Sequence, residues 1–311
     1  VTGFSARHWS RTVSGAWQYV CDRRRFHQVL ARSVQEWHPQ LIHLNGPRPA
    51  LLLPRNSKHL WRTALHVRDV RLPGWLMRHA ASGADGIIAV SRFTGCAWGS
   101  TVKDVPITVV PNGLEDESSS GPLPRCLWGP QHLKVLLVGD MTAWKRHPLF
   151  LETLRTAHLS MPEIRGIVVG RAHDRAARTY LDELQAYARA LDVHHLVQFV
   201  TDADDAEPWI GASDVLVSVA DGEPFGRTIV EALRMGKPVV TTRGGGPEEI
   251  LSNSSAGTLV APTAYDIAAG LKHWREEDTR TSIASAAREC ASEYNIEHMV
   301  EGICQVYAKI L

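Results

Sequence analysis

The sequence predicts an α/β protein with two doubly wound domains, and three observations lead to this fold class. Short apolar segments alternate with amphipathic segments, which is the order of strands and helices in βα units. Several of the apolar segments have no polar face, as expected of parallel strands buried between two layers of helices. Residues 111–131 are rich in Pro, Gly and Ser, and they separate four strand segments from six.

The strand segments are short and end at turn-forming residues. They are LIHL (41–44), TALHV (63–67), GIIAV (86–90), PITVV (106–110), LKVLLVG (133–139), RGIVVG (165–170), LVQFV (196–200), DVLVSVA (214–220), PVVTT (238–242) and GTLV (257–260). Apolar residues at helical spacing between them predict helices over 26–37, 174–191, 264–276 and 281–291.

We place the domain boundary at residue 122, which gives an N-terminal domain over 1–122 and a C-terminal domain over 123–311. In doubly wound sheets ligands bind outside the carboxyl ends of the strands, so we expect the two domains to face a ligand cleft. The chain opens without the apolar strand and glycine-containing turn that normally begin such a sheet. We therefore expect the first domain to be incomplete at its N-terminus.

Composition is typical of a globular cytoplasmic protein. The chain has 311 residues, of which 44% are hydrophobic and 22% charged, and no window approaches 18 consecutive apolar residues. The five cysteines are far apart and none forms a Cys/His pair at metal-binding spacing, so we expect reduced thiols and no metal.

Charge is unevenly distributed along the chain. Residues 1–80 contain 13 Arg or Lys against three acidic residues, a net charge of +10. This part could contact an anionic membrane at the inner face, beginning with Arg23–Arg25, or could simply form a solvated helical face. The basic residues are scattered and not interleaved with aromatics in a recognisable module, so nucleic-acid binding is not expected.

The stretch Gly222–Val240, GEPFGRTIVEALRMGKPVV, contains the residues that we expect to form the main ligand site. Glu223 lies in a turn after a strand, and Glu231 lies in the helix that follows. A helix start offers free N–H groups and a positive dipole end to a phosphate, and Gly226 lets the anion approach the backbone. Carboxylates accept hydroxyl donors, so two glutamates beside a phosphate site suit a nucleotide-sugar.

Two alternatives remain open for these glutamates. Thr228 and Glu231 fit a capping box, in which Glu231 would only reach back to the start of its helix. Glu223 could be an ordinary surface turn residue.

The stretch from Glu223 to Glu231 resembles the E-x7-E signature of retaining glycosyltransferases with the GT-B fold, glycosyltransferase family 4. Further segments in family order resemble the same enzymes: GADGIIAVSRFT (83–94), VVPNGLE (109–115), VGDMTAWKRH (138–147), IVVG (167–170) and GGGPEEIL (244–251). The resemblance implies two Rossmann-like domains, a nucleotide-sugar donor held mainly by the second domain, and a hydroxyl acceptor.

The resemblance also implies roles for individual residues. Glu223, Lys145 and His66 would be catalytic: Glu223 at the donor sugar, Lys145 on the diphosphate, and His66 facing the sugar. Donor binding would involve Glu231 at the ribose hydroxyls, together with Phe225, Gly226, Arg227, Arg146, Gly139 and Gly245. No cofactor and no divalent metal would be needed, because a lysine and a helix start stabilise the leaving diphosphate.

Without the resemblance, the same residues could have purely structural roles. Lys145 could be a solvated loop residue, and His66 could be a satisfied core histidine. Asp140 stands where the family often has an arginine on the diphosphate, with Arg146 as a possible substitute. Two alternative functions are a nucleotide-sugar 2-epimerase of the same architecture and a truncated, non-catalytic nucleotide-binding chain.

Overall fold

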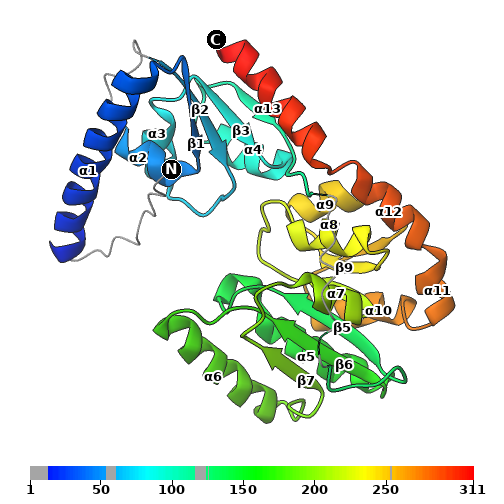
Figure 1. The fold of residues 1–311 in the computed structure, drawn as a ribbon. Coiled ribbons are helices and arrows are strands. Elements are labelled where there is room, and N and C mark those ends of the chain that lie inside the picture. Colours follow the sequence, from blue (N-terminus) through cyan, green and yellow to red (C-terminus); the bar gives the residue numbers. More distant parts are fainter. Residues whose placement is uncertain (1–12, 54–60, 116–123, 125, 253) are drawn as a thin grey trace. The chain divides into compact units, whose positions relative to one another are not determined.

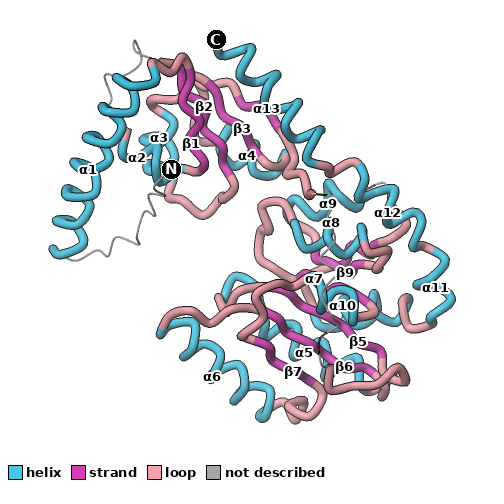
Figure 2. Tube along the Cα trace, in the orientation of Figure 1, coloured by secondary structure: helices cyan, strands magenta, loops and turns pink. Residues whose placement is uncertain are grey.

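The fold is seen in a computed structural model that describes residues 13–53, 61–115, 124, 126–252 and 254–311. It divides into two compact units, one made of residues up to Pro111 together with Met299–Leu311, the other of Asn112–His298. Each unit is a parallel sheet with helices, as the sequence predicts (Figure 1, Figure 2). No described helix is both long and apolar enough to cross a membrane.

The first unit contains a four-stranded parallel sheet in the order β1-β2-β3-β4. Its elements are α1 (Val13–Trp37), β1 (Leu41–Asn45), α2 (Pro47–Leu52), β2 (Arg62–Val67), α3 (Gly74–Ala81), β3 (Gly86–Ala89), α4 (Arg92–Gly99) and β4 (Ile107–Val109). Each strand coincides with a predicted apolar segment. Leu65 and Ile87 belong to one apolar cluster with the helices, and Ala64 and Ile88 belong to a second one.

The division between the units differs from the boundary expected at residue 122. The first unit ends at Pro111, and the chain returns to it in the last helix, α13 (Ile296–Ile310), from Met299 onward. The physical reason is an apolar stripe on α13 that packs with Ala64 and Ile88 of the first sheet. The fit is close, because a Cβ on Gly86 would lie 2.8 Å from the Ile310 side chain.

The second unit contains a six-stranded parallel sheet in the order β10-β9-β8-β5-β6-β7. Its strands are β5 (Leu133–Val138), β6 (Ile164–Val169), β7 (Val197–Val200), β8 (Val215–Ser218), β9 (Val239–Thr242) and β10 (Gly257–Val260). Its helices are η2 (Ala143–Lys145), α5 (His147–His158), α6 (Arg175–Ala190), α7 (Glu207–Ala212), α8 (Arg227–Arg234), α9 (Gly246–Leu251), α10 (Ala264–His273), α11 (Glu277–Ser282) and α12 (Ala284–Ser292).

This strand order is that of a Rossmann sheet, and it defines one topological switch point. The chain runs outward from β5 through β6 to β7, then returns to the other side of β5 and runs outward again through β8, β9 and β10. Ligands of such sheets bind where the strand order reverses, outside the carboxyl ends of the central strands. A ligand site is therefore expected at the loops after β5 and β8.

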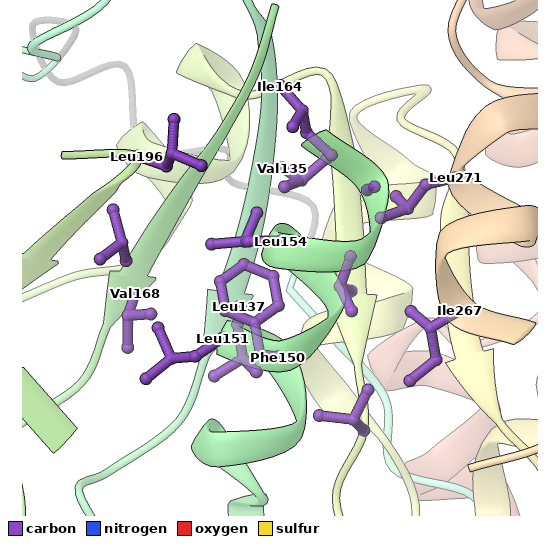
Figure 3. Packing of buried hydrophobic residues seen from close by; sticks show 14 of the residues in the cluster. Val135, Leu137, Phe150, Leu151, Leu154, Ile164, Val168, Leu196, Ile267 and Leu271 are labelled. Atoms are coloured by element: carbon purple, nitrogen blue, oxygen red, sulfur yellow. The ribbon is translucent and has the colours of Figure 1, made fainter. Parts of the chain in front are cut away.

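The core of the second unit holds β5 and β6 under α5 (Figure 3). Phe150, Leu151 and Leu154 of α5 are completely buried against these strands. A Cβ on Gly166 of β6 would lie 2.4 Å from the Leu154 side chain, so the glycine makes room for the leucine. Close packing of this kind keeps the start of α5, and the loop before it, in a defined position.

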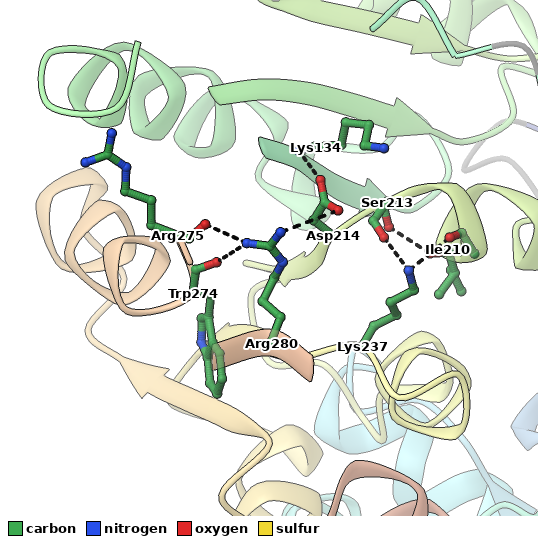
Figure 4. A network of polar contacts seen from close by, with 9 residues as sticks. Lys134, Ile210, Ser213, Asp214, Lys237, Trp274, Arg275 and Arg280 are labelled. Atoms are coloured by element: carbon green, nitrogen blue, oxygen red, sulfur yellow. Dashed lines mark hydrogen bonds and ion pairs between the residues drawn. The ribbon is translucent and has the colours of Figure 1, made fainter. Parts of the chain in front are cut away.

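A polar network fixes β5 and β8 at their amino ends, the edge opposite the switch-point loops (Figure 4). The Asp214 carboxylate accepts a hydrogen bond from the Lys134 backbone N–H at 2.7 Å, which joins the two strands. The Lys237 ammonium donates to the carbonyls of Gly211 and Ser213 at 3.0 and 2.7 Å, at the end of α7. The two central strands thus start from a fixed register.

Candidate functional site

The loop after β5 brings Lys145 back over the end of its own strand. Residues 143–145 form the 3₁₀ helix η2, and Arg146 then adopts a left-handed conformation with φ of 53° before α5 begins. A Cβ on Gly139 would lie 2.8 Å from the Lys145 side chain, and a Cβ on Gly170 would lie 1.8 Å from the Gly139 carbonyl oxygen. These glycines let the lysine stem and the end of β6 approach the backbone of β5.

Lys145 meets Glu223 across the switch point. Its ammonium lies 2.8 Å from the Glu223 carboxylate and 4.1 Å from the centroid of the Trp144 ring. Both side chains are mostly buried, with 17% and 16% exposed, so the pair is poorly screened by solvent. Two residues for which the family resemblance implies catalytic roles, 78 positions apart in the sequence, form one ion pair.

The loop after β8 is tied to the loops on both sides of it. The Asp221 N–H donates to the Trp144 carbonyl at 2.8 Å, and the Gly246 N–H donates to the Glu223 carbonyl at 2.9 Å. A Cβ on Gly245 would lie 2.6 Å from the Glu223 carbonyl oxygen, so the glycine permits this contact. Gly245 is predicted to bind the donor, but its lack of a side chain is also explained by this close backbone contact.

Helix α8 starts directly after this loop, at Gly226. That residue is the N-cap, in a left-handed conformation with φ of 105° that favours glycine, and no side chain caps the helix. The first N–H groups of α8 are therefore not satisfied by a capping side chain, which suits an anion. Phe225, just before the cap, is 5% exposed and rests against the ring of Tyr294, with centroids 5.6 Å apart.

Glu231 does not close a capping box. The box requires Thr228 at the N-cap, whereas the helix begins at Arg227 and places Thr228 inside the first turn. The Glu231 carboxylate instead lies 3.5 Å from the Arg227 guanidinium with 13% of its side chain exposed. Burial raises its pKa, against the opposing effect of Arg227. Hydroxyl donors would relieve the desolvation of this carboxylate.

Two further ion pairs stand at the ends of β5, β6 and β8. Arg146 lies 3.1 Å from Asp221, and Arg171, directly after Gly170, lies 3.3 Å from Asp140. Asp140 stands where the resembled family often has an arginine, and in the structure the guanidinium of Arg171, at the end of the neighbouring strand, lies beside it. Arg171, Trp144 and Asp221 were not assigned from sequence, because adjacency across a sheet has no signal along the chain. Arg171 and Asp221 directly follow apolar strand segments, which was the one available clue for these two residues.

His147 helps to hold the loop after β5. It is fully buried at the start of α5, with its Nε2 atom 3.4 Å from the Gly139 carbonyl oxygen. Burial lowers the pKa of His147 to about 4, against the opposing hydrogen bond to Gly139. A neutral ring can donate one hydrogen bond to that carbonyl, so the residue supports the loop without adding charge.

His66 belongs to the first unit, whereas the other assigned residues belong to the second. It lies on β2 with 1% of its surface exposed, and its Nε2 atom makes no hydrogen bond among the described residues. Its ring lies edge-on to that of His43, with centroids 5.4 Å apart, and the Tyr307 hydroxyl lies 2.7 Å from Nδ1 of His43. Burial, reinforced by Arg68 and then His43, lowers the pKa of His66 to about 3. The imidazole is therefore neutral at pH 7.

The geometry of the second unit thus offers a cationic side chain, a helix start without a capping side chain and a mostly buried carboxylate at one switch point. The second unit also resembles a known family. Residues 132–276 match the family described as Glycosyl transferases group 1.

Two curated proteins of Rhizobium meliloti are among the similar sequences. The lipopolysaccharide core biosynthesis mannosyltransferase LpsB is 26% identical over 240 residues, covering 73% of this chain and 66% of the relative. The lipopolysaccharide core biosynthesis glycosyltransferase LpsE is 37% identical over 79 residues, covering 25% of this chain and 23% of the relative. The chain thus spans less than two thirds of the length of either relative.

Similarity to solved structures extends over most of the chain. Anabaena HepE, crystallised in complex with UDP and glucose, superposes with a TM-score of 0.77 at 22% identity, covering 91% of this chain and 82% of the other. The likeness shows that the chain has the GT-B glycosyltransferase fold, which confirms the fold predicted from sequence.

Proposed function

We propose that this chain is a glycosyltransferase that moves a sugar from a nucleotide-sugar donor to a hydroxyl acceptor. The observation that carries the proposal is the switch point of the second unit. Lys145 follows β5, whereas the uncapped start of α8 and the mostly buried Glu231 follow β8, and the hydrogen bond from the Asp221 N–H to the Trp144 carbonyl joins these two segments. A cation, an anion-binding helix start and a hydroxyl acceptor match the diphosphate and ribose of a nucleotide.

In the proposed reaction the bond between the anomeric carbon and the diphosphate breaks, a bond to the acceptor oxygen forms, and the proton of the acceptor hydroxyl passes to the leaving diphosphate. Negative charge grows on the diphosphate as it leaves. Lys145 and the N–H groups at the start of α8 would stabilise that charge, and Arg146 or Arg171 would add a second cation. Glu223, which holds Lys145 in the structure, would contact the donor sugar once the diphosphate competes for the lysine.

Retention at the anomeric carbon and independence from divalent metal are part of the proposal. Retention rests on the resemblance of the stretch from Glu223 to Glu231 to retaining enzymes. Metal independence rests on Lys145 and the helix start, which supply positive charge where the diphosphate would lie. The predicted role of His66 at the sugar also stays a proposal, for a neutral ring that would act by hydrogen bonding.

The names of the matched relatives, two lipopolysaccharide core glycosyltransferases, favour transfer over the epimerase alternative. An assay with and without acceptor separates the two. A transferase consumes donor faster when a hydroxyl acceptor is present, whereas an epimerase converts the donor alone.

Contact with an anionic membrane is a further part of the proposal. Helix α1 exposes Trp17, Arg24 and Arg25 to solvent. Aromatic and basic side chains on one helix are typical of helices that lie in a membrane interface. A lipid acceptor would fit such a contact.

The decisive experiment is nucleotide titration of the variant Glu231→Gln. If Glu231 accepts hydrogen bonds from the ribose hydroxyls, the Glu231→Gln variant should bind the preferred nucleotide among UDP, GDP and ADP about tenfold or more weakly than wild type. Calorimetry measures this affinity. Glu183→Gln, an exposed glutamate on α6, is the matched control and should bind as the wild type does. Equal affinity in wild type and Glu231→Gln would remove the ribose role, and binding of none of the three nucleotides would remove the proposal itself.

A further inference from the structure

The loop between α6 and β7 gathers three metal-binding side chains. One carboxylate oxygen of Asp192 and one ring nitrogen each of His194 and His195 all lie within 4.8 Å of one another. We propose that these three residues bind a divalent transition-metal ion such as Zn²⁺. This inference is independent of the proposed glycosyl transfer.

The donor set matches the chemistry of such an ion. Imidazole nitrogen and carboxylate oxygen bind Zn²⁺ at about 2.0–2.2 Å, so two ligands of a tetrahedral ion lie about 3.4 Å apart. Nδ1 of His194 and Oδ1 of Asp192 are 3.9 Å apart, too far for a hydrogen bond and close to the metal-ligand separation. Small side-chain rotations would complete a three-residue site, with water in the fourth position.

The backbone of the loop is already fixed. Val193 and Leu196, which alternate with the proposed ligands, are 2% and 1% exposed in the core of the unit. The Asp192 N–H donates to the Arg189 carbonyl at 3.0 Å, and the Val193 N–H donates to the Ala188 carbonyl at 2.9 Å. Ion binding therefore has to order side chains only, which lowers its entropic cost.

A third imidazole supports the arrangement from a neighbouring helix. His158, the last residue of α5, lies edge-on to His195 with ring centroids 6.2 Å apart, and His195 lies edge-on to His194 at 5.5 Å. These contacts limit the orientations open to the His195 ring. His158 is not one of the three proposed ligands, and it positions the His195 ring from outside the loop.

The location indicates what the ion would do. The loop lies at the amino end of β7, whereas Lys145 and Glu223 follow the carboxyl ends of β5 and β8. The strands are parallel, so these two ends are opposite edges of one sheet. We therefore assign the ion a stabilising role, as a clamp between the end of α6 and the start of β7, with no part in donor binding.

The test is a calorimetric titration of Zn²⁺ into the untagged full chain and four variants. Wild type should bind one ion per chain at this site. His194→Ala and His195→Ala should each weaken that binding about tenfold or more, and Asp192→Asn should weaken it while keeping the shape of the residue. His273→Ala, which removes an exposed histidine on α10, is the matched control and should bind as the wild type does.

Two further readouts separate a specific site from general zinc affinity. Zn²⁺ should raise the unfolding temperature of wild type and of His273→Ala, and raise it less in the three loop variants. Bound Co²⁺ should give visible absorption bands of a low-coordinate ion that both histidine variants lose. The loop side chains are exposed, so the variants should unfold as wild type does without metal.

The proposal is overturned if His194→Ala and His195→Ala bind Zn²⁺ as tightly as wild type, or if His273→Ala loses as much affinity as they do. Nucleotide affinity should be the same with and without Zn²⁺. A failure of the metal site therefore leaves the nucleotide titrations unaffected, and a failure of nucleotide binding leaves the zinc titrations unaffected.

Discussion

Lys145 and Glu223 neutralise each other in the structure, and this pairing makes their substitution effects differ. Lys145→Ala removes the cation, so it should weaken nucleoside diphosphate binding and lower transfer about 100-fold to 1,000-fold. Glu223→Gln removes the competing carboxylate, so diphosphate affinity should stay equal or rise while transfer falls. Calorimetry with the nucleoside diphosphate and a transfer assay on both variants measure the two effects separately.

A structural role for the pair would give another result. If the ion pair only held the two loops together, both variants would lose affinity and stability in parallel, because breaking a largely buried pair leaves one charge uncompensated. Asp221→Asn is the matched control, since it breaks the neighbouring and more exposed pair with Arg146. Its diphosphate affinity should change less than that of Lys145→Ala.

At the level of single elements, local sequence was enough to predict the unit that carries the site. The strand, turn and helix around Gly222–Val240 follow from an apolar run, three turn residues and a helix closed by Gly236. The start of the helix was harder to predict. Thr228 looked like a cap, but the left-handed conformation of Gly226 starts the helix earlier and leaves Glu231 free of capping.

Contacts between elements were not predictable from the sequence in the same way. Arg171 and Asp140 are 31 residues apart, and they meet because β5 and β6 are neighbours in the sheet. Helix α13 has an apolar stripe, and its packing with Ala64 and Ile88 and the close fit of Ile310 over Gly86 place it on the first sheet. Periodicity identifies an apolar face, but the surface that covers this face depends on shape.

Helix α1 permits a prediction about membrane contact. Trp17 and Arg24 are seven residues apart and so share one exposed face, whereas Phe26 and Leu30 pack on the first unit. Each basic residue near an anionic surface contributes about 1 kcal/mol, so Arg24→Gln with Arg25→Gln should weaken binding to anionic vesicles at low salt by about tenfold or more. Co-sedimentation with vesicles measures this.

A control on α6 separates specific contact from overall charge. Arg178→Gln with Arg189→Gln removes the same charge from the other unit and should leave vesicle binding unchanged. Equal loss in both double variants, or no binding of wild type at low salt, would contradict a contact through α1.

At the level of the whole molecule, each unit contains a buried histidine that makes stability depend on pH. His66 in the first unit and His147 in the second are 1% and 0% exposed, and burial lowers their pKa values to about 3 and about 4. In the unfolded chain both return to about 6.5. Between the folded and unfolded values the unfolded state binds more protons, so the free energy of unfolding should rise with pH there.

The change of the free energy of unfolding with pH has a predictable size for each histidine. Stability should be lost progressively as pH falls below about 6.5, by about 1.4 kcal/mol per pH unit for each of the two residues, until the folded pKa is reached. Glu231 acts in the opposite direction, because burial raises the pKa of its carboxyl group and protonation favours the folded state. Because Glu231 titrates in both wild type and a histidine variant, its contribution cancels when the stabilities of the two proteins are compared.

His147→Gln isolates the contribution of the second unit. It removes one titrating group, so proton uptake on unfolding between pH 4 and pH 6 should fall by about one proton, measured by denaturant unfolding at a series of pH values. Thr153→Ser in the same helix is the matched control, because it changes a fully buried polar side chain that does not titrate. The control should lower stability equally at every pH. A wild-type slope in His147→Gln would show that the folded protein accepts a proton on this ring as readily as the unfolded chain does.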